Sequence, residues 1–332
     1  MRAQTSKKQF TMFVIGVFAL GWILQIIASI FVNRGENTVF RVIMAVCMYM
    51  PLLSVLIAGI PLKGMGFIPH LKGKIRYIFF SLWMPAVLSI IGGVLFFVIF
   101  PNAYDGEFET MRSLMQEAGA LEQLEAKGLT IESYLVISTI QAVTIAPFIN
   151  MLFALGEEIG WRGAMYPYLK GKLGVTKGRI VGGAIWGCWH WPVMILAGYE
   201  YGKDYLGAPV LGPIVFCLST AAMGILLDYV YEKTGTIWMP SLMHGAINAF
   251  TIFAYMTKPE YADKMILGPA HIGIISMIPL AALSGIICIK KTRDKKDIHR
   301  KCIDMIYKSS YLCDNTARCN VLSPIRGRNK GE

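Results

Sequence analysis

The chain has 332 residues, of which 55% are hydrophobic and only 16% are charged, and its formal net charge is +11. A soluble domain of this size would need more polar surface, so we expect many apolar residues to face lipid. The excess of Lys and Arg is then explained by basic loops and membrane lipid, and it calls for no nucleic-acid partner. The seven cysteines show neither a disulfide framework nor the paired spacing of a metal site.

Apolar stretches of roughly 20 residues, long enough to cross a bilayer, recur along the chain. The loops between them alternate between basic composition and acidic or mixed composition. Because basic loops stay in the cytosol, an even number of spans with both termini inside satisfies nearly every loop. The sequence therefore predicts an all-α, polytopic bundle of about eight transmembrane helices in the cell membrane, with both termini cytosolic. The expected spans lie at 10–32, 40–60, 77–100, 134–159, 180–198, 209–231, 236–257 and 270–289.

Two segments depart from this bundle, which occupies residues 1–290. Residues 102–133 form a polar insert, which the loop charges place outside the cytosol. We expect either a solvated loop or an amphipathic interfacial helix there. The tail at 291–332 is basic and short of apolar clusters, which predicts a disordered or membrane-surface cytosolic segment. The insert nevertheless carries apolar residues at helical spacing, namely Met111, Leu114, Met115, Ala118, Leu121 and Leu124.

Ionisable side chains inside the expected spans are candidate functional residues, because each is costly in a bilayer unless it is paired or hydrated. The fourth span contains Glu157, Glu158 and Arg162. Glu158 and Arg162 stand at i, i+4 with the acid first, the favourable order for an ion pair. Glu157 points about 100° away around the helix. We therefore expect Arg162 to neutralise Glu158 and leave Glu157 as a general base.

Two further spans place polar residues on one helix face. Trp186 and His190 stand at i, i+4 in the fifth span, as do His244 and Asn248 in the seventh. At 1.5 Å per residue, Glu157 and His190 lie about 15 Å, and His244 about 12 Å, from the expected cytosolic helix ends. The similar depths predict one cavity, opening toward the cytosol, that contains Glu157 with both histidines and Asn248.

The three motifs together resemble a known family. Glu157-Glu158-x-x-x-Arg162, Trp186-x-x-x-His190 and His244-x-x-x-Asn248 are similar to the signature motifs of the CPBP intramembrane proteases, the CAAX-protease and bacteriocin-processing (Abi) family. The resemblance covers about residues 134–257, which would be the protease-like core of the bundle. One departure is visible, because the second motif usually begins with Phe and here begins with Trp186.

The resemblance implies a role for each motif residue. Glu157 would activate a water molecule with help from His190. His244 and Asn248 would stabilise the oxyanion at the scissile carbonyl. Structural support would come from Glu158, Arg162 and Trp186. The implied activity is that of an intramembrane endopeptidase acting on a membrane-associated, hydrophobic or lipidated peptide.

Several alternatives stay open. Glu157, His190 and His244 could instead hold a catalytic zinc ion, which would make the protein a metalloprotease. A glutamate-type mechanism without a cofactor is preferred, because a zinc-bound Glu157 leaves no base other than the paired Glu158. A bacteriocin-immunity or transport-like protein could use the same polar cavity for binding only. A membrane scaffold could recruit partners through the acidic insert. Substrate identity and oligomeric state are not predicted.

Overall fold

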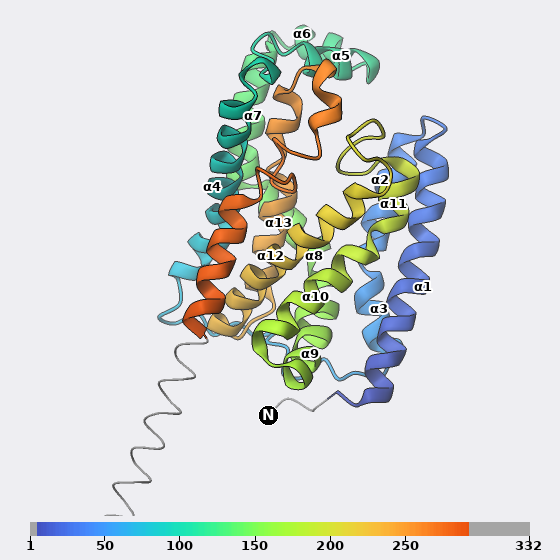
Figure 1. The fold of residues 1–332 in the computed structure, drawn as a ribbon, viewed down its shortest axis with the longest axis vertical. Helices are drawn as coiled ribbons and strands as arrows, with labels where there is room; N and C mark the ends of the chain where they lie inside the picture. The colour runs from blue at the N-terminus through green and yellow to red at the C-terminus, as the bar shows by residue number, and fades with distance from the viewer. Residues whose placement is uncertain (1–4, 292–332) are drawn as a thin grey trace, which may run out of the picture. The chain divides into compact units, whose positions relative to one another are not determined.

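The computed structural model describes residues 5–291, and it is built of helices and connecting loops (Figure 1). Within these residues there is no β-strand, only an isolated antiparallel bridge between Tyr104 and Thr257. The predicted all-α fold is confirmed. The described residues up to Gly285 form one compact unit, which contains every predicted site residue. The predicted basic tail lies outside the described residues, except for Lys291.

Five helical segments among the described residues are long and apolar enough to cross a membrane. A sixth is formed by α7 and the helix that follows it, if this pair, bent by 52°, counts as one span. A membrane protein with several spans is therefore confirmed. The five segments are α1 (Lys7–Val32), α2 (Asn37–Cys47) with α3 (Met50–Ile57), α4 (Arg76–Ile99), α10 (Val175–Trp189) with α11 (Trp191–Ala197), and α12 (Leu211–Thr234).

The bent pair carries the first motif. It consists of α7 (Ile131–Thr144) and a continuous helical stretch made of α8 (Ala146–Gly160), the π-helical turn η2 (Trp161–Met165) and α9 (Tyr166–Leu173). The π turn begins three residues after Glu158, and π turns inside α-helices are frequent at functional sites.

The last two expected spans differ from the prediction. In place of a helix over 236–257, α13 (Trp238–Ala249) has only 12 residues, too few to cross a bilayer. The chain then continues in the 3₁₀ turns η3 (Ile252–Met256) and η4 (Pro259–Lys264). The final helix begins at residue 278 and reaches residue 291, the end of the described chain. The count of eight spans is thus not confirmed, and the orientation of the termini stays a prediction.

Close helix packing brings the motif helices together. α13 packs against α8, and α10 packs against α12. A Cβ atom at Gly245 of α13 would lie 2.5 Å from the carbonyl oxygen of Pro147 in α8, so only glycine allows this approach. Gly183 of α10 has the same role against the backbone of Ala221 in α12. The first contact holds the first and third motifs next to each other, and α12, which packs against both α10 and α13, connects the second motif to them.

The insert is helical in part, as its apolar periodicity predicted. After the short 3₁₀ turn η1 (Pro101–Ala103) it forms α5 (Glu109–Glu117) and α6 (Leu121–Ala126), which are separated at Gly119, where φ is +62°. The two helices lie at one end of the unit (Figure 1). They cover an apolar cluster made of Met111, Met115, Leu124, Ile131 and Leu135.

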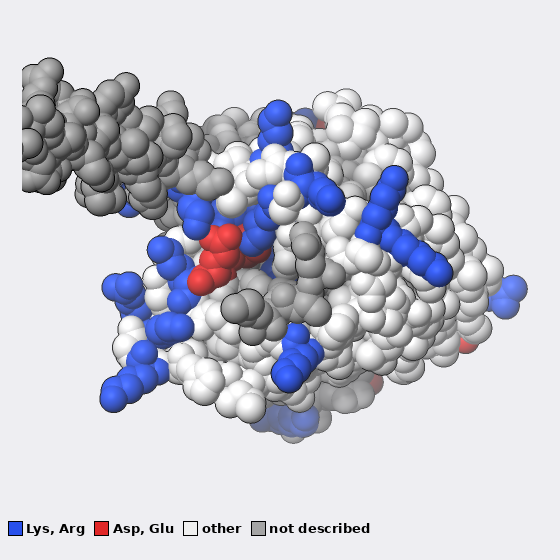
Figure 2. All heavy atoms as spheres, turned by 90° about the horizontal axis from the view of Figure 1, so that it is seen from below, with Lys and Arg blue, Asp and Glu red and all other residues white. Residues whose placement is uncertain are grey.

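The opposite end of the unit carries α9 and the beginning of α1 (Figure 1). Figure 2 shows this end from below, with Lys and Arg side chains spread over it and one small acidic group among them. Beneath it, the buried Asp228 carboxylate accepts hydrogen bonds from Lys170 at 2.7 Å and Arg179 at 2.6 Å. A basic face of this kind is what the positive-inside rule expects on the cytosolic side.

Candidate active site

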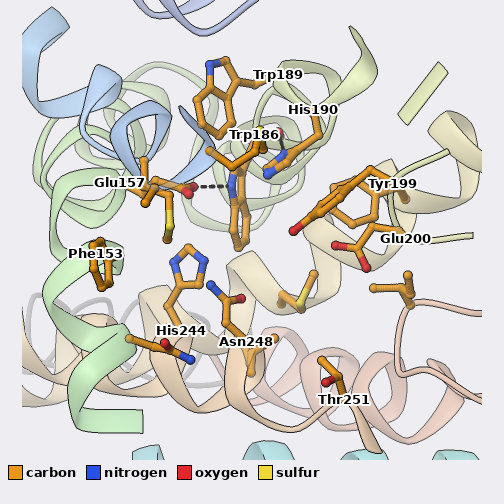
Figure 3. A pocket seen from close by; sticks show the side chains of 18 of the residues that line it. Phe153, Glu157, Trp186, Trp189, His190, Tyr199, Glu200, His244, Asn248 and Thr251 are labelled. Carbon is orange, nitrogen blue, oxygen red and sulfur yellow. Dashed lines mark hydrogen bonds between the residues drawn. The ribbon is translucent and has the colours of Figure 1, made fainter. Parts of the chain in front are cut away.

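A cavity with a volume of about 540 Å³ lies among α2, α8, α10, α12, α13 and the loops that follow α11 and α13. Figure 3 shows it from close by. All four predicted catalytic residues line this one cavity, together with Trp186. The structure therefore brings together residues that are separated by up to 91 positions in the chain. The four residues are Glu157, His190, His244 and Asn248.

Glu157 is held through one of its two carboxylate oxygens. Its Oε2 accepts a hydrogen bond from the indole Nε1–H of Trp161 at 2.9 Å and a second from that of Trp186, also at 2.9 Å. The side chain is buried, with the residue only 2% exposed. Because both indoles use Oε2, Oε1 is left available to a water molecule in the cavity.

Glu158 forms the predicted ion pair and one contact that the sequence did not predict. Its Oε1 lies 2.9 Å from Nη1 of Arg162, and both side chains are fully buried. The same oxygen lies 2.8 Å from Nδ1 of His244. Since a carboxylate can only accept, Nδ1 of His244 donates this hydrogen bond. Glu158 therefore orients the imidazole of His244 as well as pairing with Arg162.

His190 lies at the break between α10 and α11, two residues before Pro192. Its Nδ1 is 3.1 Å from the backbone carbonyl oxygen of Trp186. Because the carbonyl oxygen can only accept, Nδ1 carries the proton, and Nε2 of the neutral ring is an acceptor. The rings of Trp189 and Phe216 pack edge-on against the imidazole, with their ring centres 4.8 and 5.1 Å from its centre, and they restrict its orientation.

Asn248 lies in the last turn of α13, one turn after His244. Figure 3 shows its side chain beside His244 at the pocket wall. The two residues therefore share one helix face, as their i, i+4 spacing predicted. An amide nitrogen and an imidazole nitrogen next to each other are suitable donors to a developing negative charge.

The zinc alternative stays a hypothesis. Across residues 5–291, no three His, Cys, Asp or Glu side chains are grouped closely enough to hold a metal ion. Within the predicted set, the hydrogen bonds use Oε2 of Glu157 and Nδ1 of each histidine. They leave Oε1 and both Nε2 atoms as the atoms that would hold the ion, since a zinc-bound histidine usually donates its other ring N–H to an oxygen.

The outer part of the cavity lies at the end of the unit opposite the basic face. Its outer lining comes from the first turns of α2, from residues 199–200 and from residues 251–272, all at the end that carries the insert. The loops at the basic face contribute no lining residue. On that side Trp161, Arg162 and Tyr166 are fully buried and fill the bundle below Glu157. The cavity therefore does not reach the basic face, and its predicted opening toward the cytosol stays a prediction, as the orientation of the termini does.

Two polar side chains that bear on the site, Trp161 through its bond to Glu157 and Glu200 in the cavity lining, were not predicted. Trp161 stands four residues after Glu157, so the spacing argument used for Glu158 and Arg162 could have found it. Glu200 lies in the loop after α11 and also lines the cavity. A loop has no periodicity that would indicate where its side chains point, so no sequence signal distinguishes Glu200 from other loop acids.

Fold and cavity together define a polytopic α-helical membrane protein with a buried carboxylate and imidazole site. Residues 138–250 match the family model described as Type II CAAX prenyl endopeptidase Rce1-like. The chain is also similar to CAAX prenyl protease 2 of Methanococcus maripaludis, with 29% identity over 102 residues. That match spans 30% of this chain and 37% of the relative. The resemblance to the CPBP intramembrane proteases, predicted from the three motifs, is thus confirmed for this region of the chain.

Proposed function

We propose that this protein is an intramembrane endopeptidase, and that it hydrolyses a peptide bond in a hydrophobic or lipidated peptide with a water molecule activated by Glu157 and His190. The observation that carries the proposal is the position of Glu157. Two indole N–H groups hold one of its oxygens, while two imidazoles and an amide line the same cavity. Amide hydrolysis needs this combination of a base, a positioned water molecule and donors aimed at the oxyanion.

In the proposed first step, Oε1 of Glu157 and Nε2 of His190 accept hydrogen bonds from one water molecule. The water oxygen attacks the scissile carbonyl carbon, a C–O bond forms, and the proton passes to Glu157. The carbonyl π electrons move to oxygen and produce the oxyanion. Glu157 then returns the proton to the leaving nitrogen as the C–N bond breaks, so that the carboxylate is regenerated.

His244 and Asn248 are proposed to stabilise the oxyanion. The Asn248 amide donates directly. To donate from Nε2 as well as from Nδ1, the His244 imidazole must be protonated on both nitrogens. The Glu158 carboxylate at 2.8 Å can balance that positive charge, and Arg162 keeps this carboxylate in place.

The substrate class is proposed from the cavity lining and from the relative. Apart from its polar set, the cavity is lined by aromatic, methionine and other apolar side chains, which suit a hydrophobic chain. The similar archaeal protein is named a CAAX prenyl protease, so a farnesylated peptide that ends in a CAAX sequence is the first substrate to test. A matched peptide without the lipid tests whether the lipid is required.

The test is cleavage of both peptides by the purified protein in detergent, followed by mass spectrometry. We expect Glu157→Gln to lower the cleavage rate by about 10²-fold to 10⁴-fold, the usual contribution of a general base, with an unchanged melting temperature. Glu122→Gln, in the exposed part of the insert, is the matched control and should keep full activity. Retained cleavage by Glu157→Gln would contradict the assignment of the base.

A chelator separates the two mechanisms. We expect full activity after treatment with a zinc chelator. Loss of activity that added zinc restores would instead favour the metalloprotease alternative. Tight binding of both peptides without any cleavage would favour a protein that uses the cavity for binding only.

A further inference from the structure

Glu200 is a second carboxylate at the same cavity. It lies in the loop between α11 and α12, and Figure 3 shows it beside Tyr199, across the pocket from Glu157. Its side chain is exposed to the cavity. Among the described residues, Glu200 forms no ion pair, in contrast to Glu158 and Asp228. This carboxylate takes no part in the proposed hydrolysis.

The backbone at Glu200 is held in an unfavourable conformation. Its φ is +77°, and Phe108 is the only other described non-glycine residue with a positive φ. L-residues with a Cβ atom rarely adopt this region, and such strain is typical of functional sites. A glycine would relieve the strain, so the presence of a charged residue here indicates that its side chain has a role.

The surroundings of Glu200 leave its negative charge without compensation. Protein atoms around the carboxylate raise its pKa to about 7, although the cavity side is open. Seven other titratable or charged side chains line the cavity, namely Arg41, Glu157, His190, Tyr199, His244, Tyr255 and His271. Arg41 lies on α2 and forms no ion pair among the described residues. The Glu200 charge and burial raise the pKa of Tyr199, and burial lowers that of His271 to about 4, so both are neutral near pH 7.

We propose that Glu200 forms a subsite for a positively charged group of the substrate, so that the cavity selects peptides with a Lys or Arg side chain near the scissile bond. The carboxylate would form a charge-assisted hydrogen bond with that group inside the cavity. This inference rests on the proposed peptidase function, because a charge subsite beside Glu157 selects what is cleaved.

The test compares peptides that differ at one position near the scissile bond and carry Lys, norleucine or Glu there. The measured quantity is the ratio of kcat/KM for the Lys peptide to that for the norleucine peptide. Effects of a variant on the common chemistry cancel in this ratio. We expect Glu200→Gln to lower the ratio by about 10-fold, the effect of losing a hydrogen bond to a charged group. An unchanged ratio would overturn the inference.

A second variant separates the loss of the carboxylate from a folding defect. Glu200→Gly should lower the ratio equally while keeping or raising the melting temperature, because glycine adopts φ +77° without strain. Arg41→Gln is the matched control, since it removes an unpaired charge of opposite sign from the same cavity. It should leave the Lys preference intact or raise it. A fall as large as that in Glu200→Gln would contradict the assignment to Glu200.

The pH dependence provides an independent readout. Above pH 7 Glu200 is ionised, so the Lys preference should be full, and it should decline as the pH falls below about 7 and the carboxylate is protonated. In Glu200→Gln the ratio should be flat. A decline that persists in this variant would come from another titratable group of the cavity and would contradict the role of Glu200.

The inference and the proposed function can fail separately. Cleavage without a Lys preference would overturn the subsite and leave the peptidase. If no peptide is cleaved, the same peptides with a fluorescent label are used to compare binding by anisotropy. Tighter binding of the Lys peptide to the wild type than to Glu200→Gln would then support the subsite without the peptidase. Equal binding would overturn it.

Discussion

The motif helices and the insert differ in how their polar side chains are placed, buried and paired in the first and exposed in the second. In the motif helices, Glu157, Glu158, Arg162 and His244 are at most 4% exposed, and they contact one another or tryptophan indoles. In the insert the charged side chains of α5 and α6 are exposed, and a small apolar cluster lies beneath them. Removing one partner of a buried ion pair lowers the free energy of unfolding strongly, because a charge is left buried without compensation. An exposed charge contributes little to that free energy.

The two regions are joined by few contacts. The insert is attached to the segment after α13 by backbone hydrogen bonds from Asp105 to Met256 at 2.9 Å and from Lys258 to Ala103 at 3.0 Å. The Thr110 hydroxyl also donates to the carbonyl oxygen of Thr257 at 2.8 Å. Because these contacts do not involve Glu157 or its partners, the insert should open without disturbing the catalytic network.

The largest effect is expected at the buried ion pair. Arg162→Met removes the partner of a fully buried Glu158, and it also removes a guanidinium that lies 4.8 Å from the ring centres of both Tyr166 and Trp186. We expect a loss of about 3–5 kcal/mol in the free energy of unfolding, measured in detergent, because an uncompensated charge stays buried.

Arg112→Met is the matched control for this prediction. Arg112 is an exposed arginine on α5 of the insert, so its loss should change the free energy of unfolding by no more than about 0.5 kcal/mol. Equal losses for the two variants would remove the distinction between the buried network and the exposed insert.

A smaller and more local effect is expected in the insert. Met115 is 8% exposed and belongs to the apolar cluster, so Met115→Ala should cost about 2 kcal/mol. Hydrogen exchange should become faster over residues 105–135 and 252–258 and stay unchanged in α8 and α13. Leu114→Ala, next in the chain and 45% exposed, is the control and should leave exchange unchanged. Faster exchange around Glu157 in Met115→Ala would show that the two regions unfold together.

Local patterns were the predictable part of this molecule. The i, i+4 spacing identified the Glu158 and Arg162 pair, and the apolar periodicity identified helices in the insert. The contact of Glu158 with His244 joins residues 86 positions apart, and helix periodicity carries no information on such a contact. The short α13 was missed for a related reason. Hydropathy measures how apolar a segment is, whereas residues 252–264 form 3₁₀ turns next to the insert through long-range hydrogen bonds.

The smallest predicted effect concerns Trp186, where this chain departs from the Phe expected at the start of the second motif. The indole N–H of Trp186 donates to Glu157, a bond that Phe could not form. Trp186→Phe should keep the aromatic wall against Arg162 and His244. It leaves the Glu157 carboxylate held by Trp161 alone. We expect kcat to fall about 10-fold with KM changed less than about 2-fold, because the lost bond orients the base and does not bind substrate.

Trp238→Phe is the matched control. Its indole N–H also donates a hydrogen bond inside the bundle, to the carbonyl oxygen of Phe67 at 2.8 Å, but away from the cavity. This variant should keep the wild-type kcat. The double variant Trp161→Phe with Trp186→Phe should lose more than the product of the two single losses, because either indole alone still fixes Oε2 of Glu157. Strictly multiplicative losses would mean that the two indoles act on Glu157 independently of each other, whereas an increase in KM alone would mean that Trp186 acts only as a wall of the pocket.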